Sequence, residues 1–156
     1  MQNLKDIPCL ILGIGNILWA DEGFGVRVVE AFNDKYAFTD PNNVIADGGT
    51  LGMYLYDRIC RAEKLLIFDC CDFKGKPGEL RVLRNDDVKL WTSTKISPHQ
   101  TGMNDLLVAA AVRGAVPKEI AVVGFQPILL DDYGGSLSPE AKANIDEAVR
   151  DGYEIV

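Results

Sequence analysis

The sequence contains a single histidine, His99, and no pair of cysteines at the Cys-x-x-Cys spacing of structural zinc sites. Its four cysteines, of which Cys70 and Cys71 are adjacent, do not resemble a disulfide framework either. Positive charge is scarce, because 16 Lys and Arg stand against 23 Asp and Glu and leave a formal net charge of −7. This charge argues against a nucleic-acid partner, since phosphate binding needs clustered Lys and Arg.

Long apolar runs are also missing, and no stretch approaches the roughly 18 residues of a membrane span. The first eight residues hold Lys5 and Asp6 and lead straight into a strand-like run, so we expect no signal peptide. The cysteine pattern is typical of reduced thiols. The sequence therefore predicts a cytoplasmic protein with no membrane partner.

The composition that is present is that of an ordinary globular chain, with 47% hydrophobic and 25% charged residues. A length of 156 residues is close to that of one domain, and no repeat, linker or low-complexity tract divides it. We therefore expect one domain over residues 1–156.

Short apolar runs alternate along the chain with segments of helical periodicity. We predict strands at 8–13, 44–47, 64–69, 79–84 and 119–125, and helices at 21–35, 51–61, 102–113 and 138–150. Asp21, Thr50 and Ser138 are the expected N-caps, the last with Pro139 at the first helical position. The inner strands are apolar throughout, whereas residues 79–84 alternate, which is typical of an edge strand. The predicted fold is α/β, a twisted mostly parallel sheet sandwiched between helices with one antiparallel edge strand.

Polar side chains follow the predicted strands where each one ends. Glu22 lies in the turn after the first strand, Asp47 ends the second and Asp69 ends the third. His99 lies in the loop that enters the helix at 102. Because ligands of open α/β sheets bind beyond the carboxyl ends of the strands, we expect these four side chains along one edge.

Two carboxylates and one imidazole suit a borderline divalent ion such as zinc or nickel. Structural roles remain open for the same residues: Glu22 as a partner of the helix dipole, Asp47 as a helix cap and His99 as a core histidine. Asp69 is harder to explain structurally, because a carboxylate that ends an apolar strand needs a partner.

Two other chemistries fit the sequence less well. Gly13-x-Gly15 follows a strand, but the third glycine of a dinucleotide fingerprint would fall at Leu18, and Asp21-Glu22 would repel a pyrophosphate. There is no Gly-x-Ser-x-Gly elbow. A cysteine paired with the histidine is a further possibility, but cysteines beside a buried strand are more often core residues.

Several motifs together resemble the maturation endopeptidases of nickel–iron hydrogenases, in order and spacing over nearly the whole chain. They are Gly13-Ile-Gly-Asn16, Asp21-Glu22-Gly-Phe-Gly25, Asp47-Gly-Gly-Thr50, Asp69 with Lys76-Pro77-Gly78 behind it, and Ser97-Pro-His-Gln-Thr-Gly102. Residues 124–127 with 133–136 resemble the branch of that family that matures uptake hydrogenases.

This resemblance implies a cytoplasmic monomer that acts on the precursor of the hydrogenase large subunit. After nickel insertion, such an enzyme removes a short C-terminal extension. The resemblance assigns metal contact to Glu22, Asp69 and His99, and a part in cleavage or substrate recognition to Asp47. Nickel would arrive with the precursor, and zinc or cadmium can occupy the same site. No role in that family is implied for Cys70 and Cys71.

The sequence leaves the role of the metal open between a Lewis acid and a recognition element. It shows no protein nucleophile, so a water activated by a metal or a carboxylate is the chemical alternative. Two competing classes remain: another metal-dependent hydrolase of small peptides, and a nickel-binding chaperone that binds the precursor without shortening it.

Overall fold

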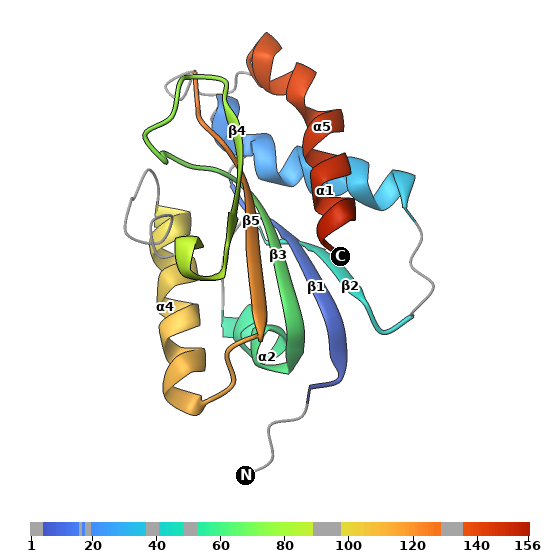
Figure 1. Cartoon of the computed structure of the whole chain (residues 1–156), viewed down its shortest axis with the longest axis vertical. Helices are drawn as coiled ribbons and strands as arrows, with labels where there is room; N and C mark the ends of the chain where they lie inside the picture. The colour runs from blue at the N-terminus through green and yellow to red at the C-terminus, as the bar shows by residue number, and fades with distance from the viewer. Residues whose placement is uncertain are drawn as a thin grey trace.

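A five-stranded sheet in the order β2-β1-β3-β5-β4 forms the centre of the protein (Figure 1). The computed structural model describes residues 5–15, 17, 20–36, 41–48, 53–88, 98–128 and 136–156, with only the backbone at 53, 54 and 98–104. Its strands are β1 (Ile7–Gly13), β2 (Val44–Asp47), β3 (Ala62–Cys70), β4 (Leu80–Arg84) and β5 (Glu119–Phe125). All neighbouring pairs are parallel except β4 with β5, which is antiparallel. The predicted fold class is confirmed.

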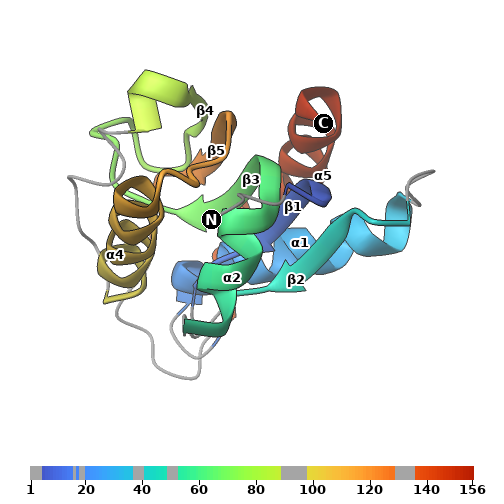
Figure 2. The ribbon, with the colours of Figure 1, turned by 90° about the horizontal axis from the view of Figure 1, so that it is seen from below.

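Helices cover both faces of this sheet. They are α1 (Phe24–Lys35), α2 (Met53–Arg61), α4 (Pro98–Arg113) and α5 (Pro139–Ile155), with short 3₁₀ helices η1 (Ala20–Gly23) and η2 (Asn85–Asp87). Helix α1 packs against α5 on one face, and α2 lies beside α4 on the other (Figures 1 and 2). No described helix combines the length and the apolar character that crossing a membrane requires.

Two hydrophobic cores follow from the two-residue period of the inner strands. Leu10 and Leu12 of β1 pack on the α2/α4 face, whereas Ile11 between them packs on the α1/α5 face. The same alternation separates the adjacent cysteines, because Cys70 belongs to the α1/α5 core and Cys71 to the α2/α4 core. Both are buried and free. The two thiols therefore lie on opposite faces of the sheet, and each is covered by a different pair of helices.

The ends of several elements differ from the sequence predictions. Helix α4 begins at Pro98 and not at 102, since proline fits the first turn of a helix, where its missing N–H is not needed. Helix α5 continues to Ile155 and not to 150, because its last turn still packs: the Tyr153 ring stacks on Tyr36 with centroids 4.0 Å apart.

The predicted helix caps have different outcomes. Ser138 is the N-cap of α5, and its side chain accepts a hydrogen bond from the Ala141 N–H. The prediction for Asp21 is wrong: α1 begins after Gly23, which makes no side-chain cap, and Asp21 lies before it in η1. The structure does not describe residue 50, so the predicted cap of Thr50 lies outside the described residues.

The contact between α5 and β3 yields a stability prediction. A Cβ added at Gly152 would lie 2.8 Å from Cε1 of Phe68, whose ring is fully buried and has no room to move. Gly152→Val should therefore lower the free energy of unfolding by about 1–3 kcal/mol through overpacking. Ala143→Val, at an exposed position of the same helix, is the matched control and should cost less than about 0.7 kcal/mol. Equal urea midpoints for the two variants would contradict this packing.

Candidate active site at the carboxyl edge of the sheet

The strand register brings Asp47 and Asp69 to the same edge of the sheet. Gly13, the last residue of β1, pairs with Asp47 of β2 on one side and with Phe68 of β3 on the other. Two strand spacings therefore separate the backbones of β2 and β3, a distance of about 10 Å. The pairing continues beyond β1, since Ile14 N donates to Phe68 O at 2.9 Å and Gly48 N to Gly13 O at 2.8 Å.

Two glycines allow the turn that carries Glu22 to lie against these strand ends. Gly15 has φ of +142°, and a Cβ there would collide with the carbonyl oxygen of Glu22. Gly25, in the first turn of α1, has its Cα against the carbonyl oxygens of Phe68 and Ile14. The N-terminal end of α1 is thus pressed onto the ends of β1 and β3, one residue before Asp69.

The carboxylates of this region act on a common neighbour, the thiol of Cys70. Burial is the main reason why the pKa of the Cys70 thiol lies well above its usual range, and the charges of Asp69, Asp21 and Glu22 raise that pKa further. Three carboxylates from β3 and η1 therefore act on one thiol at the end of β3. Asp69 is buried, with 3% of its surface exposed, and Glu22 is half-buried.

Asp47 differs from these residues because its side chain is exposed at the end of β2. Gly48 behind it is buried and bonded to β1, so the backbone is fixed while the carboxylate faces solvent. An exposed carboxylate at this edge can approach a bound substrate. Its catalytic role remains a prediction.

The backbone of His99 lies in the first turn of α4, and its side chain lies outside the described residues. The turn at 114–118 joins the end of α4 to the start of β5, so α4 runs opposite to β5 and its N-terminal end points toward the carboxyl edge (Figure 1). Among the described side chains alone, no three His, Cys, Asp or Glu form a group that could hold a metal. The predicted metal site of Glu22, Asp69 and His99 therefore remains a prediction that depends on the imidazole.

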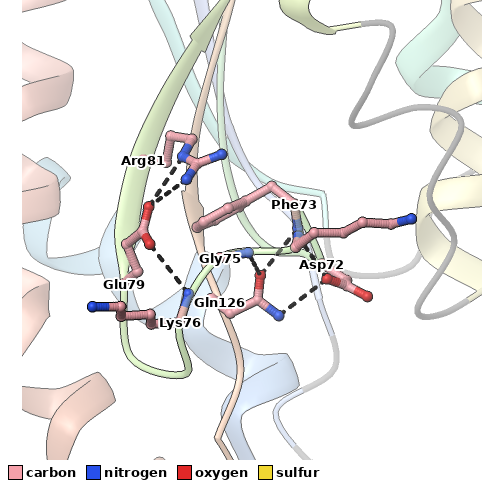
Figure 3. A network of polar contacts seen from close by, with 8 residues as sticks. Asp72, Phe73, Gly75, Lys76, Glu79, Arg81 and Gln126 are labelled. Atoms are coloured by element: carbon pink, nitrogen blue, oxygen red, sulfur yellow. Dashed lines mark hydrogen bonds and ion pairs between the residues drawn. The ribbon is translucent and has the colours of Figure 1, made fainter.

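Sequence reasoning missed Gln126, which organises the loop after Asp69 (Figure 3). Its Oε1 accepts hydrogen bonds from the backbone N–H groups of Phe73 and Gly75, both at 3.1 Å, and its Nε2 donates to Asp72 at 3.2 Å. Its backbone pairs with the far side of the loop, donating to the Glu79 carbonyl at 2.8 Å. The signal was a polar residue directly after an apolar strand, since a buried amide must be satisfied.

An arginine closes the outer side of the same loop. The Arg81 guanidinium lies over the Phe73 ring, 4.5 Å from its centroid, and donates twice to Glu79, at 2.7 and 3.1 Å. The hydrogen bond from the Lys76 N–H is the main reason why the pKa of Glu79 lies below its usual range, and the hydrogen bond from Arg81 lowers that pKa further. The segment that follows Asp69 is therefore fixed by polar contacts on both sides.

A cavity of about 360 Å³ lies elsewhere, between α1 and α5. Its lining includes the apolar side chains of Leu137 and Ile145 and the charged side chains of Arg27 and Lys142. None of the four predicted site residues lines it, so it is not the site that the strand ends define.

Comparison with known proteins agrees with this architecture. The family model described as hydrogenase maturation protease matches residues 26–154. The hydrogenase expression/formation protein HoxM of Azotobacter vinelandii is 46% identical over 148 residues, which cover 94% of this chain and 71% of that protein. The chain therefore belongs to the hydrogenase maturation protease family, and so to the protease class of hydrolases.

Escherichia coli provides both a sequence match and a structural match. The hydrogenase 2 maturation protease is 40% identical over 141 residues, covering 90% of this chain and 85% of that protein. The solved structure of the hydrogenase maturating endopeptidase HybD superposes with a TM-score of 0.85 at 38% identity, covering 93% of this chain and 89% of that one. The solved structure of the NiFe hydrogenase maturation protease HybD from Thermococcus kodakarensis superposes with a TM-score of 0.76 at 25% identity, covering 96% of this chain and 99% of that one.

The Gln126 contacts predict a measurable loss of stability when the amide is removed. Gln126→Met keeps the length of the side chain but leaves the Phe73 and Gly75 N–H groups without their acceptor, which should cost about 1–3 kcal/mol in urea unfolding. Amide hydrogen exchange should accelerate at Gly75. Lys74→Met, at an exposed position of the same loop, should stay within about 0.5 kcal/mol of the wild type. A Gln126→Met protein as stable as the wild type would show that water replaces the amide.

Thiol chemistry tests the cysteine alternative. Burial raises the pKa of Cys9 to about 11, so roughly one molecule in a thousand carries that thiolate at pH 8. Cys70 and Cys71 are shifted in the same direction, and all four thiols are buried. Because the thiolate is the reactive form, Ellman's reagent should titrate four thiols only after denaturation. Rapid reaction of one thiol in the folded protein would restore a cysteine nucleophile as a candidate.

Proposed function

We propose that this protein is the endopeptidase that removes the C-terminal extension of a nickel–iron hydrogenase large-subunit precursor once nickel has been inserted. In this proposal it acts as a cytoplasmic monomer, and nickel belongs to the substrate. The observation that carries the proposal is the family match over residues 26–154, together with the predicted site residues at the positions that the family motifs give them.

The geometry supports a division of labour among the carboxylates. Asp69 lies near the end of β3 and Glu22 in η1, both at the carboxyl edge of the sheet, where each can present oxygen ligands to an ion held by the precursor. His99 is the proposed nitrogen ligand. Its neutral imidazole is the form that binds a metal, so recognition of the precursor weakens as the ring takes up a proton.

Asp47 is the proposed general base. It is exposed, stands about two strand spacings from β3, roughly 10 Å, and can take a proton from a water that attacks the scissile peptide carbonyl. Buried cysteines supply no competing nucleophile in the described part of the chain. In this scheme nickel is a recognition element. Glu22, Asp69 and His99 bind the nickel that the precursor carries, and the carboxylate of Asp47 activates the water.

The central experiment is incubation of the purified protein with nickel-loaded and with nickel-free precursor, followed by mass spectrometry of the large subunit. The loaded precursor should lose a C-terminal fragment, and the nickel-free precursor should stay intact. A bound but unshortened precursor would identify a chaperone. Hydrolysis of small peptides without any effect on the precursor would identify a different hydrolase.

Asp47→Asn tests the catalytic assignment. The variant should fold as the wild type does, because the side chain is exposed, but processing should slow by about 100-fold or more, the usual contribution of a general base. Asp86→Asn is the matched control, since Asp86 is exposed in η2, beyond the end of the antiparallel strand β4 and away from this edge. Processing at the wild-type rate by a folded Asp47→Asn protein would reduce Asp47 to a structural residue.

A further inference from the structure

Asp21 is a fully buried carboxylate that neither the predicted metal set nor the predicted catalytic role uses. Its Oδ1 accepts a hydrogen bond from Ser138 N at 2.7 Å. Its Oδ2 accepts from Ser138 Oγ at 2.9 Å and from Ile128 N at 3.0 Å. Three donors from the segment after β5 and the start of α5 therefore bind one side chain of the turn between β1 and α1.

The η1 turn that carries Asp21 also carries Glu22. A 3₁₀ helix has three residues per turn, so consecutive side chains point about 120° apart. With the Asp21 side chain fixed inward toward α5, the Glu22 side chain is directed elsewhere and is half-buried. The orientation of Glu22 thus depends on where Asp21 is held.

The backbone of this turn needs such support. Ala20 has φ of +44°, a conformation that residues other than glycine rarely adopt, and the residue is buried. On the other side, the Glu22 carbonyl lies against Gly15. A strained turn persists only where its surroundings determine it, and the three bonds to Asp21 are contacts of that kind.

We propose that Asp21 is a positioning residue for Glu22: by bonding to Ser138 and Ile128, it holds η1 so that the Glu22 carboxylate is presented to a divalent ion at the sheet edge. The inference rests on the proposed metal-recognising role of Glu22. Asp21 itself does not touch the ion. Through Ser138 it also connects the site to α5, whose N-cap is the same serine.

Asp21→Asn is the first variant. An asparagine keeps an acceptor for Ser138 N, but its amide NH₂ opposes the Ile128 N–H, donor against donor. Titration calorimetry with cadmium ion alone should show at least tenfold weaker binding than in the wild type. Asp34→Asn, the same substitution at an exposed position of α1, should bind cadmium as the wild type does.

A double-mutant cycle separates positioning from general stability. If Asp21 acts through Glu22, then Asp21→Asn should add no further loss of cadmium affinity to a Glu22→Gln protein. A merely structural role would lower the affinity by the same factor on both backgrounds. Where Asp21→Asn does not fold, Ser138→Ala is the milder variant, because it removes the hydroxyl donor but keeps the backbone N–H that bonds Asp21.

The cadmium experiments can overturn the positioning role of Asp21 independently of the proposed function. Equal losses on the two backgrounds, wild-type affinity in Asp21→Asn, or no cadmium binding by the wild type would each overturn the positioning role. Failure of the wild type to shorten nickel-loaded precursor would overturn the proposed function, whereas the cadmium cycle would still decide the role of Asp21.

Discussion

The close contact between the start of α1 and the ends of β1 and β3 is the constraint on which the edge of the sheet depends. Gly25 lies against the Phe68 and Ile14 carbonyl oxygens, and any side chain there would push the helix away from the sheet. This contact sets the height of η1 above the strands. The carboxylates of η1 and of Asp69 in β3 thereby act on the same thiol: burial raises the pKa of Cys70, and these carboxylates raise it further.

The order of the strands adds the remaining members of the edge. β1 lies in the centre of β2-β1-β3, so its last residue is flanked by Asp47 of β2 and by Phe68 of β3, the residue before Asp69. The chain must reach the amino edge before each parallel strand begins, and α4 runs there before β5, with its N-terminal end toward the site. Residues far apart in sequence meet because parallel strands share a carboxyl edge.

Much of this arrangement was predictable from the sequence, since it depends on local patterns. Apolar runs between polar turns predicted every strand, and the acids that end β2 and β3 follow directly from those runs. Asp21 was misassigned because an acid before a helical pattern is typical of an N-cap, whereas its partners lie more than 100 residues later. Gln126 was missed for the same reason: its place after an apolar strand indicates a buried amide, but its partners are 51 to 54 residues away and the sequence does not name them.

The two borders of the sheet limit how an extended peptide can attach to it. β2 offers four residues, and β4 offers five, with Arg81 and Arg84 exposed along it. Many proteins capture an extended segment by pairing its backbone with an edge strand. Edge strands that are short or carry charged side chains are poor templates for such pairing. The borders of the sheet therefore favour recognition of an extended peptide by side chains at the strand ends over the addition of a sixth strand.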